Sequence, residues 1–132
     1  MDLLFLKASK YTPEVRLNVR ERTLSFRGRS SPENALQFYD RVYAAIDKYF
    51  NAGGKALKVK FVFEYFNTSS SKCIFEIFRK LQSHQAKGKL IKIDWIYEEG
   101  DDDMMETGED FADIIGVKVN YVEVDNIEEI AA

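Results

Sequence analysis

The sequence predicts an α/β fold in which a single domain, residues 1–132, contains an open mixed sheet and three helices. Several segments alternate apolar and polar side chains with a period of two, as half-buried strands do. From Ser30 onward these segments alternate with stretches at helical spacing, and strand-helix-strand units imply parallel strands joined by right-handed crossovers. Two strand patterns before Ser30 are joined by a short turn instead, which adds an antiparallel hairpin.

Three strands are expected before the first helix. Residues 2–8 form a short strand or an ordered lead-in. Residues 14–20 and 23–27 each alternate between apolar and polar side chains, and the chain turns between them near Glu21 and Arg22.

The first helix is expected to begin in the segment Ser30–Asn34. A Ser cap, Pro32 at the first helical position and Glu33 in the first turn form a start signal. Gly53 and Gly54 end the helix. One stripe of the helix is apolar and is expected to face the sheet. Its members are Leu36, Tyr39, Val42, Tyr43, Ile46 and Phe50.

The strand over residues 56–66 is the most apolar in the chain, so we expect it at the centre of the sheet. Its alternation assigns one face to Leu57, Val59, Phe61, Phe63 and Tyr65. A second helix follows from Thr68 to about Ala86, where basic residues and Gly88 provide an end signal.

The C-terminal part predicts a strand over residues 90–97, a short helix over residues 104–115 and an edge strand over residues 117–124. Trp95 is expected in the core. The tail beyond Asp125 is expected to be frayed.

Three strand-to-helix junctions meet at one edge of this sheet if the strands preceding them run parallel. Open α/β sheets place their ligands at such an edge. We therefore expect the candidate functional residues there. They are Arg27, Arg29, Glu33 and Asn34 at the first junction, the hydroxyl run that begins at Thr68 at the second, and Glu98, Glu99, Asp101, Asp102 and Asp103 at the third.

The second junction places hydroxyl groups on the first turn of a helix, because Asn67 is followed by Thr68, Ser69, Ser70 and Ser71. Free backbone N–H groups and the positive end of the helix dipole favour negative charge there. Two interpretations remain open. Thr68 or a neighbouring serine accepts a phosphate, for which Arg27 or Arg29 would be available, or the segment is only a helix cap.

A hydrolase triad is not expected. The lone histidine, His84, lies on the same helix as Thr68 and about 24 Å away at 1.5 Å per residue. We expect His84 to be an ordinary surface residue. Cys73 is expected to be a small helix residue with no reactive role, although its place on the first turns could lower its pKa.

The acidic segment from Glu98 to Asp103 has two interpretations. Carboxylates are the ligands that Mg²⁺ prefers, so a small magnesium-dependent or nucleotide-binding protein is an alternative function. A solvated acidic helix start is the simpler interpretation, because neither a glycine-rich phosphate loop nor calcium-loop spacing accompanies the acids.

Composition excludes several classes of protein. The net charge of −3 and the lack of a basic stripe argue against a nucleic-acid partner. The apolar runs are too short for membrane insertion and the first residues lack signal-peptide features, so a cytoplasmic location is expected. One Cys and one His do not make a zinc site, and no metal or cofactor is expected.

Four segments of the chain together resemble the SiaC family of bacterial regulatory phosphoproteins. They are Ser31-Pro32-Glu33-Asn34, the strand end and hydroxyl run from Tyr65 to Lys72, Trp95-Ile96-Tyr97, and the acidic segment from Asp101 to Phe111. The resemblance covers nearly the whole chain in order. More distantly, a hydroxyl at a strand-to-helix junction is similar to the anti-sigma-factor antagonists of the STAS fold, so a STAS-like domain is implied.

The resemblance implies a non-enzymatic partner switch. Thr68 would be phosphorylated by a serine/threonine protein kinase and dephosphorylated by a PP2C-type phosphatase. The unphosphorylated form would bind an effector such as a diguanylate cyclase and so affect cyclic di-GMP and biofilm formation. Asn67, Ser69, Ser70 and Ser71 are expected to shape the helix start. The partner interface is expected to include Glu33, Asn34, Lys72, Tyr97, Asp101, Asp102 and Asp103.

Overall fold

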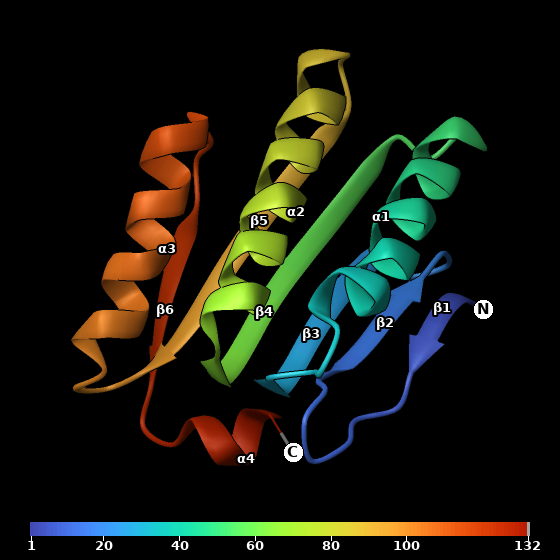
Figure 1. The fold of residues 1–132 in the computed structure, drawn as a ribbon. Coiled ribbons are helices and arrows are strands. Elements are labelled where there is room, and N and C mark those ends of the chain that lie inside the picture. The colour runs from blue at the N-terminus through green and yellow to red at the C-terminus, as the bar shows by residue number, and fades with distance from the viewer. Residues whose placement is uncertain (132) are drawn as a thin grey trace.

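The computed structural model describes residues 1–131 as one six-stranded sheet with three long helices on one side (Figure 1). Along the chain the elements are β1 (Asp2–Leu6), β2 (Glu14–Asn18), β3 (Thr23–Ser30), α1 (Ala35–Asn51), β4 (Ala56–Phe66), α2 (Thr68–Ala86), β5 (Leu90–Glu98), α3 (Asp102–Ile115), β6 (Asn120–Val124) and α4 (Ile127–Ala131).

The strands lie in the sheet in the order of the sequence, from β1 at one edge to β6 at the other. β1, β2 and β3 are antiparallel neighbours, whereas β3, β4, β5 and β6 are parallel. The predicted open mixed sheet, with its N-terminal hairpin and parallel C-terminal half, is therefore confirmed. The C-terminal ends of β3, β4 and β5 lie at one edge, the lower edge in Figure 1, and the three junctions lead from that edge into the helices.

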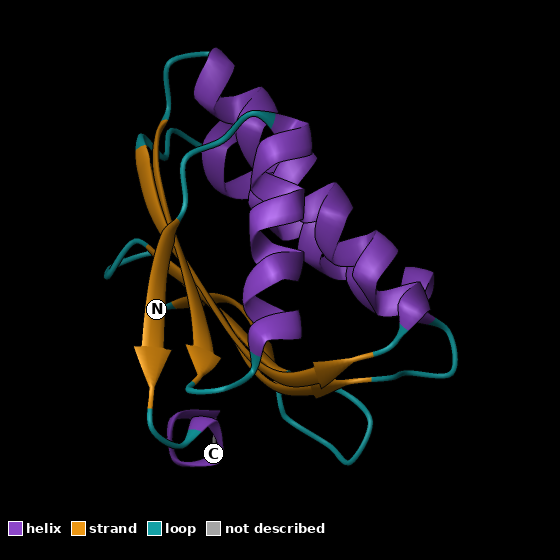
Figure 2. Ribbon diagram, turned by 90° about the vertical axis from the view of Figure 1, so that its left-hand side faces the viewer, coloured by secondary structure: helices purple, strands orange, loops and turns teal. Residues whose placement is uncertain are grey.

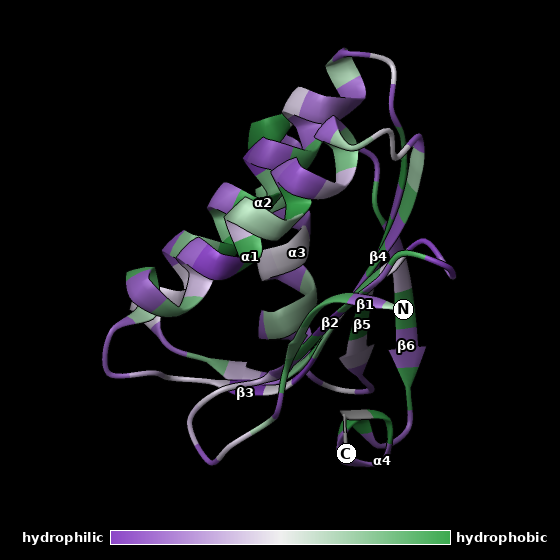
Figure 3. Cartoon of the chain, turned by 90° about the vertical axis from the view of Figure 1, so that its right-hand side faces the viewer, coloured by the Kyte–Doolittle hydropathy of each residue, from purple (hydrophilic) through white to green (hydrophobic). Residues whose placement is uncertain are grey.

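The core lies between the sheet and the helices α1, α2 and α3. Figure 3 shows these helices as alternating hydrophilic and hydrophobic bands, as expected of helices with one exposed and one buried side. Trp95 is at the centre, with ring centroids 5.4 Å from Phe61, 5.9 Å from Phe78 and 6.1 Å from Phe111. Its indole N–H donates to the carbonyl of Met104 at 2.9 Å, which fastens the first turn of α3 to β5.

The first helix begins later than the sequence predicts. Ser31, the residue before Pro32, does not cap the helix. Its N–H donates to the carbonyl of Tyr11 at 2.8 Å, and Ser30 is still the last residue of β3, where it pairs with Phe66 of β4. The cap is Asn34, whose side chain accepts from the N–H of Gln37 at 3.0 Å, and the first turn holds no acidic residue. Leu36, expected on the buried stripe, is 61% exposed.

The alternation in β4 fails near its end. The register against β3 shifts between Gly28 and Arg29, and such an irregularity changes which side chains face the core. Tyr65, expected on the face of Phe63, is therefore 44% exposed, while Phe66 packs against the core.

The tail also differs from expectation. Residues 127–131 form α4, a fourth and short helix, and Ile127 is 7% exposed. Figure 2 shows α4 on the side of the sheet that faces away from α1, α2 and α3. None of the helices described in residues 1–131 combines the length and apolar character needed to cross a bilayer.

Candidate functional site

The candidate site is the first turn of α2, where β4 reaches the edge of the sheet. Asn67 caps the helix with an extended backbone (φ −82°, ψ 177°), and its side-chain oxygen accepts from the N–H of Ser70 at 2.9 Å. The carbonyl of Asn67 accepts from the N–H of Ser71 at 2.9 Å. The predicted cap is therefore observed, and it places Thr68 at the first helical position.

This helix start retains capacity to bind an anion. Within residues 1–131 the N–H groups of Thr68 and Ser69 have no acceptor, because the first N–H groups of a helix lack intrahelical partners. The first turn also contains no acidic side chain. In α3 the same region is occupied by Asp102 and Asp103, which offset the dipole of that helix. The dipole of α2 has no such counter-charge in its first turn.

The four hydroxyl residues differ in accessibility. Thr68 and Ser69 are exposed, Ser71 is half-buried and Ser70 is 0% exposed. A kinase needs access to the hydroxyl oxygen and room for a phosphoryl group. Burial therefore removes Ser70 from the candidate acceptors and favours Thr68 and Ser69.

A buried hydrogen-bond network lies beneath the site. Ser30 Oγ donates to Ser70 Oγ at 2.8 Å, and Ser30 Oγ also lies 2.7 Å from the hydroxyl oxygen of Tyr39 on α1. The N–H of Asn67 donates to the carbonyl of Ser30 at 3.0 Å. Burial raises the pKa of Tyr39 well above its usual value, so its hydroxyl stays protonated. The network holds the start of α2 against β3 and α1.

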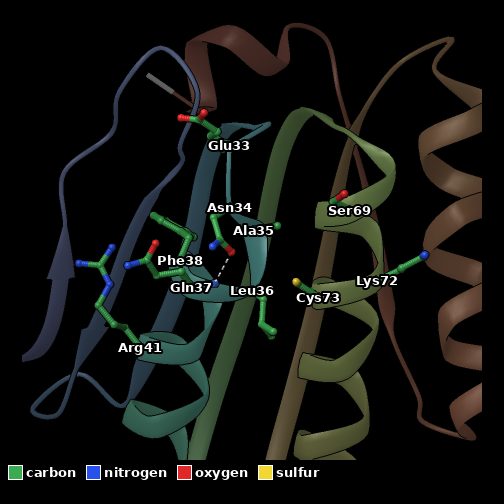
Figure 4. A pocket seen from close by; sticks show the side chains of 10 residues that line it. All are labelled: Glu33, Asn34, Ala35, Leu36, Gln37, Phe38, Arg41, Ser69, Lys72 and Cys73. Atoms are coloured by element: carbon green, nitrogen blue, oxygen red, sulfur yellow. Dashed lines mark hydrogen bonds between the residues drawn. The ribbon is translucent and has the colours of Figure 1, made fainter.

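A groove runs between the N-terminal turns of α1 and α2 beside this site (Figure 4), with a volume of about 1320 Å³. Leu36 projects from α1 beside the groove, and the sulfur of Cys73 points from α2 toward α1. The side chain of Lys72 lies on the side of α2 that faces away from α1. The residues that line the groove are Glu33, Asn34, Ala35, Leu36, Gln37, Phe38, Arg41, Ser69, Lys72 and Cys73.

The predicted interface residues fall into two groups. Glu33, Asn34 and Lys72 line the groove together with Ser69. Tyr97, Asp101, Asp102 and Asp103 lie at the β5–α3 junction and do not line it. Sequence reasoning did not anticipate the other groove residues, which are Ala35, Leu36, Gln37, Phe38, Arg41 and Cys73. For Leu36 the sequence did contain an indication of this position, because Leu36 lies at the border of the apolar stripe of the helix rather than at its centre.

The acidic segment has a structural role in the helix start. The side chain of Asp101 caps α3 by accepting from the N–H of Met104 at 3.1 Å, and Asp102 and Asp103 lie in the first turn. Within residues 1–131 no three His, Cys, Asp or Glu side chains come together in a group that could hold a metal ion. This geometry does not favour the magnesium interpretation.

Arg27 and Arg29 do not serve the site as expected. Both lie on the sheet face opposite the long helices, because Gly28 and Ser30 are the buried residues beside them in β3. Arg27 Nη1 donates to the carbonyl of Ile130 at 2.7 Å, and Arg29 stacks on Tyr65 with its guanidinium carbon 5.0 Å from the ring centroid.

His84 and Cys73 also differ from expectation. His84 is buried rather than on the surface: its Nε2 lies 2.9 Å from Asp47 Oδ1, and its ring lies 4.5 Å from that of Phe50. Lys80 donates to the other oxygen of Asp47 at 2.7 Å. Burial raises the pKa of the Cys73 thiol, and the charges of Asp40 and Glu76 act in the same direction.

A sequence profile of the SiaC family, described as regulatory phosphoproteins, matches residues 6–124. The chain belongs to the SiaC family. An uncharacterised protein of Pseudomonas aeruginosa strain UCBPP-PA14 is 25% identical over 111 residues, which cover 84% of this chain and 88% of that protein.

Solved SiaC structures have the same fold. One of them is a crystal structure of SiaC from Pseudomonas aeruginosa in complex with the diguanylate cyclase SiaD, which that SiaC activates. That SiaC superposes on this chain with a TM-score of 0.86 at 22% identity, and the match covers 92% of this chain and 99% of that chain. The apo form of that SiaC gives a TM-score of 0.83 at 23% identity, covering 92% and 98%. This SiaC-family chain therefore shares the fold of those proteins.

Proposed function

We propose that this SiaC-family protein is a non-enzymatic partner switch in which reversible phosphorylation of Thr68 decides whether an effector binds. One observation carries the proposal: in the described part of the chain, residues 1–131, the start of α2 combines an exposed hydroxyl, two N–H groups without acceptors and a first turn without acids. A phosphoryl group adds nearly two negative charges and three acceptor oxygens. The N–H groups and the dipole of α2 stabilise that charge.

Three partners follow from this function. A serine/threonine protein kinase adds the phosphate and a PP2C-type phosphatase removes it. The unphosphorylated protein binds an effector, for which a diguanylate cyclase is the leading candidate. The activation of SiaD by SiaC in Pseudomonas aeruginosa supports this choice. The output is then a change in cyclic di-GMP and biofilm formation, and the protein acts in the cytoplasm.

The docking surface that we assign to these partners is the junction edge together with the groove between α1 and α2. Glu33, Asn34 and Lys72 form the part near Ser69, and Asn67 and Ser71 fix the helix start. The β5–α3 junction supplies a second, acidic part with Tyr97, Asp101, Asp102 and Asp103. Phosphate on Thr68 adds negative charge to this edge. It therefore lowers the affinity of partners that bind there through acceptor groups or close packing.

Phosphate mapping tests the acceptor. The protein is incubated with its kinase and ATP, and the modified residue is identified by mass spectrometry. We expect one phosphate, on Thr68, and no modification of Ser70. Thr68→Ala is expected to abolish incorporation, whereas the matched variant Ser69→Ala retains it. Phosphate appearing elsewhere in the Thr68→Ala protein shows that Thr68 is not the acceptor.

Partner capture tests the switch. Wild type and Thr68→Ala are expected to retain the effector, and Thr68→Asp is expected to lose it. If Thr68 were only part of a helix start, Thr68→Asp would change stability slightly and leave the affinity of every partner unchanged. Equal capture of the effector by wild type and by protein phosphorylated on Thr68 contradicts the proposal.

A further inference from the structure

The short helix α4 lies in a site on the sheet face that the three long helices leave open. It contacts β3, β4 and β5 at the end of the sheet where these strands terminate. Ile127 packs there in a small apolar cluster, separate from the main core, with Val62, Ile96 and Val124. Val62 is 0% exposed although it points away from α1, α2 and α3. A single isoleucine side chain therefore covers this apolar spot.

Side chains from the sheet hold α4 at both ends. Glu98 Oε1, at the end of β5, accepts from the N–H of Ile127 at 2.9 Å. Arg27 Nη1, on β3, donates to the carbonyl of Ile130 at 2.7 Å. The first N–H groups and the last carbonyls of a helix lack partners within the helix, so a carboxylate at one end and a guanidinium at the other match what one helical turn presents.

The arrangement has the properties of a recognition site. It offers an apolar patch for one branched side chain, an acceptor for a free N–H and a donor for a free carbonyl. These groups recognise backbone ends and one aliphatic residue. Of the other α4 side chains, Glu128, Glu129 and Ile130 are exposed. The helix has five residues, too few to be stable in isolation, so it exists because the site orders it.

The segment that fills the site lies beyond the part of the chain that the SiaC family profile matches, which ends at residue 124. Only Asp125 and Asn126 separate it from β6, and both are exposed. Release of α4 therefore requires breaking the Ile127 packing and two hydrogen bonds, while the main core stays intact.

We propose that this apolar patch, with Glu98 and Arg27 beside it, is a peptide-binding site, that α4 is its built-in occupant, and that a partner segment with one branched aliphatic anchor competes with α4 for it. The inference goes beyond the proposed switch and does not involve Thr68. An occupant held in cis lowers the apparent affinity of a competing segment by the fraction of molecules in which the site is open. Binding of the partner then releases the C-terminal segment.

The test uses the full chain and a peptide with the sequence of residues 125–132 as the probe. In the variant Ile127→Glu the built-in occupant is displaced, and the peptide is expected to shift the amide NMR signals of Val62, Ile96 and Val124. Its affinity for wild type is expected to be at least tenfold weaker. Circular dichroism and Trp95 fluorescence like those of wild type establish that the variant is folded.

Two controls define the site. A peptide carrying Ile127→Glu is expected not to bind. Adding Arg27→Gln to the Ile127→Glu protein is expected to weaken the peptide several-fold, whereas the matched change Arg29→Gln, on a residue that stacks on Tyr65, leaves affinity unchanged. The proposal is overturned if the folded Ile127→Glu protein does not bind the peptide, or if wild type binds it equally well.

Discussion

The hydroxyl of Ser30, at the end of β3, donates to the hydroxyl of Ser70, in the first turn of α2, at 2.8 Å in a fully buried position. The two residues are forty positions apart in sequence. Their contact fixes the height at which α2 begins above the sheet, and so fixes where Thr68 emerges at the surface.

Ser70→Ala is therefore expected to lower the free energy of unfolding by about 1–3 kcal/mol, because it leaves a hydroxyl hydrogen of the Ser30–Tyr39 pair without an acceptor in an apolar site. Urea unfolding measures the change. Ser69→Ala, one residue away and exposed, is expected to stay within about 0.5 kcal/mol of wild type. Equal stability of the two variants would show that the buried network contributes nothing.

The packing of α3 against β5 gives a second prediction. A Cβ atom on Gly108 would lie 2.7 Å from Cδ1 and Nε1 of Trp95, a distance that no real contact tolerates. Gly108→Ala is expected to destabilise the protein by about 1–3 kcal/mol, since the indole or the helix must move. Alanine otherwise stabilises a helix by about 1 kcal/mol relative to glycine. Unchanged or increased thermal stability would show that α3 moves freely against Trp95.

The sequence was sufficient to predict the sheet and its three long helices, because each of these strands and helices has a clear apolar period. Each helical crossover also requires the two strands that it joins to be parallel. The same reasoning placed Thr68 at a helix start on the correct edge. It failed where a residue's local signal was overridden by a partner distant in sequence. Ser31 followed by Pro32 has the sequence pattern of a helix start, but Ser30 pairs with Phe66 and the N–H of Ser31 donates to Tyr11, so Asn34 becomes the cap.

Two further differences have the same origin. The helix α4 is too short to show a period, and it forms because Val62, Glu98 and Arg27 hold it. His84 did carry a local signal, since it lies seven residues after Ile77 on the buried side of α2. Its partner Asp47 is on α1, and sequence alone does not join the two.

The ion cluster of Asp47, Lys80 and His84 predicts a dependence of stability on pH. Partial burial alone would raise the pKa of Asp47, but hydrogen bonds and charges from Lys80 and His84 outweigh it and hold the pKa below its usual value. A carboxyl with a depressed folded-state pKa stabilises the protein above its unfolded pKa, about 3.9, and this contribution is lost as pH falls through the folded pKa.

The stability difference between wild type and Asp47→Asn is therefore expected to be constant from about pH 5 to 6 and to shrink progressively below about pH 4. Urea unfolding at several pH values measures it. Asp40→Asn, an exposed change on the same helix, serves as the control and is expected to show a smaller effect of pH. A difference that grows on acidification would mean that the Asp47 pKa is raised instead.

The groove beside Thr68 gives the last prediction, which depends on the proposed docking surface. Leu36 borders the groove and is 61% exposed, so Leu36→Glu is expected to leave stability within about 0.5 kcal/mol of wild type. A leucine buried in an interface contributes about 1.5–3 kcal/mol, so the same change is expected to weaken effector binding about tenfold or more. Titration calorimetry with the effector measures this. Leu90, 72% exposed at the opposite edge of the sheet, provides the matched control, because Leu90→Glu adds the same charge away from the groove. Equal affinities of the two variants would place the effector elsewhere on the protein.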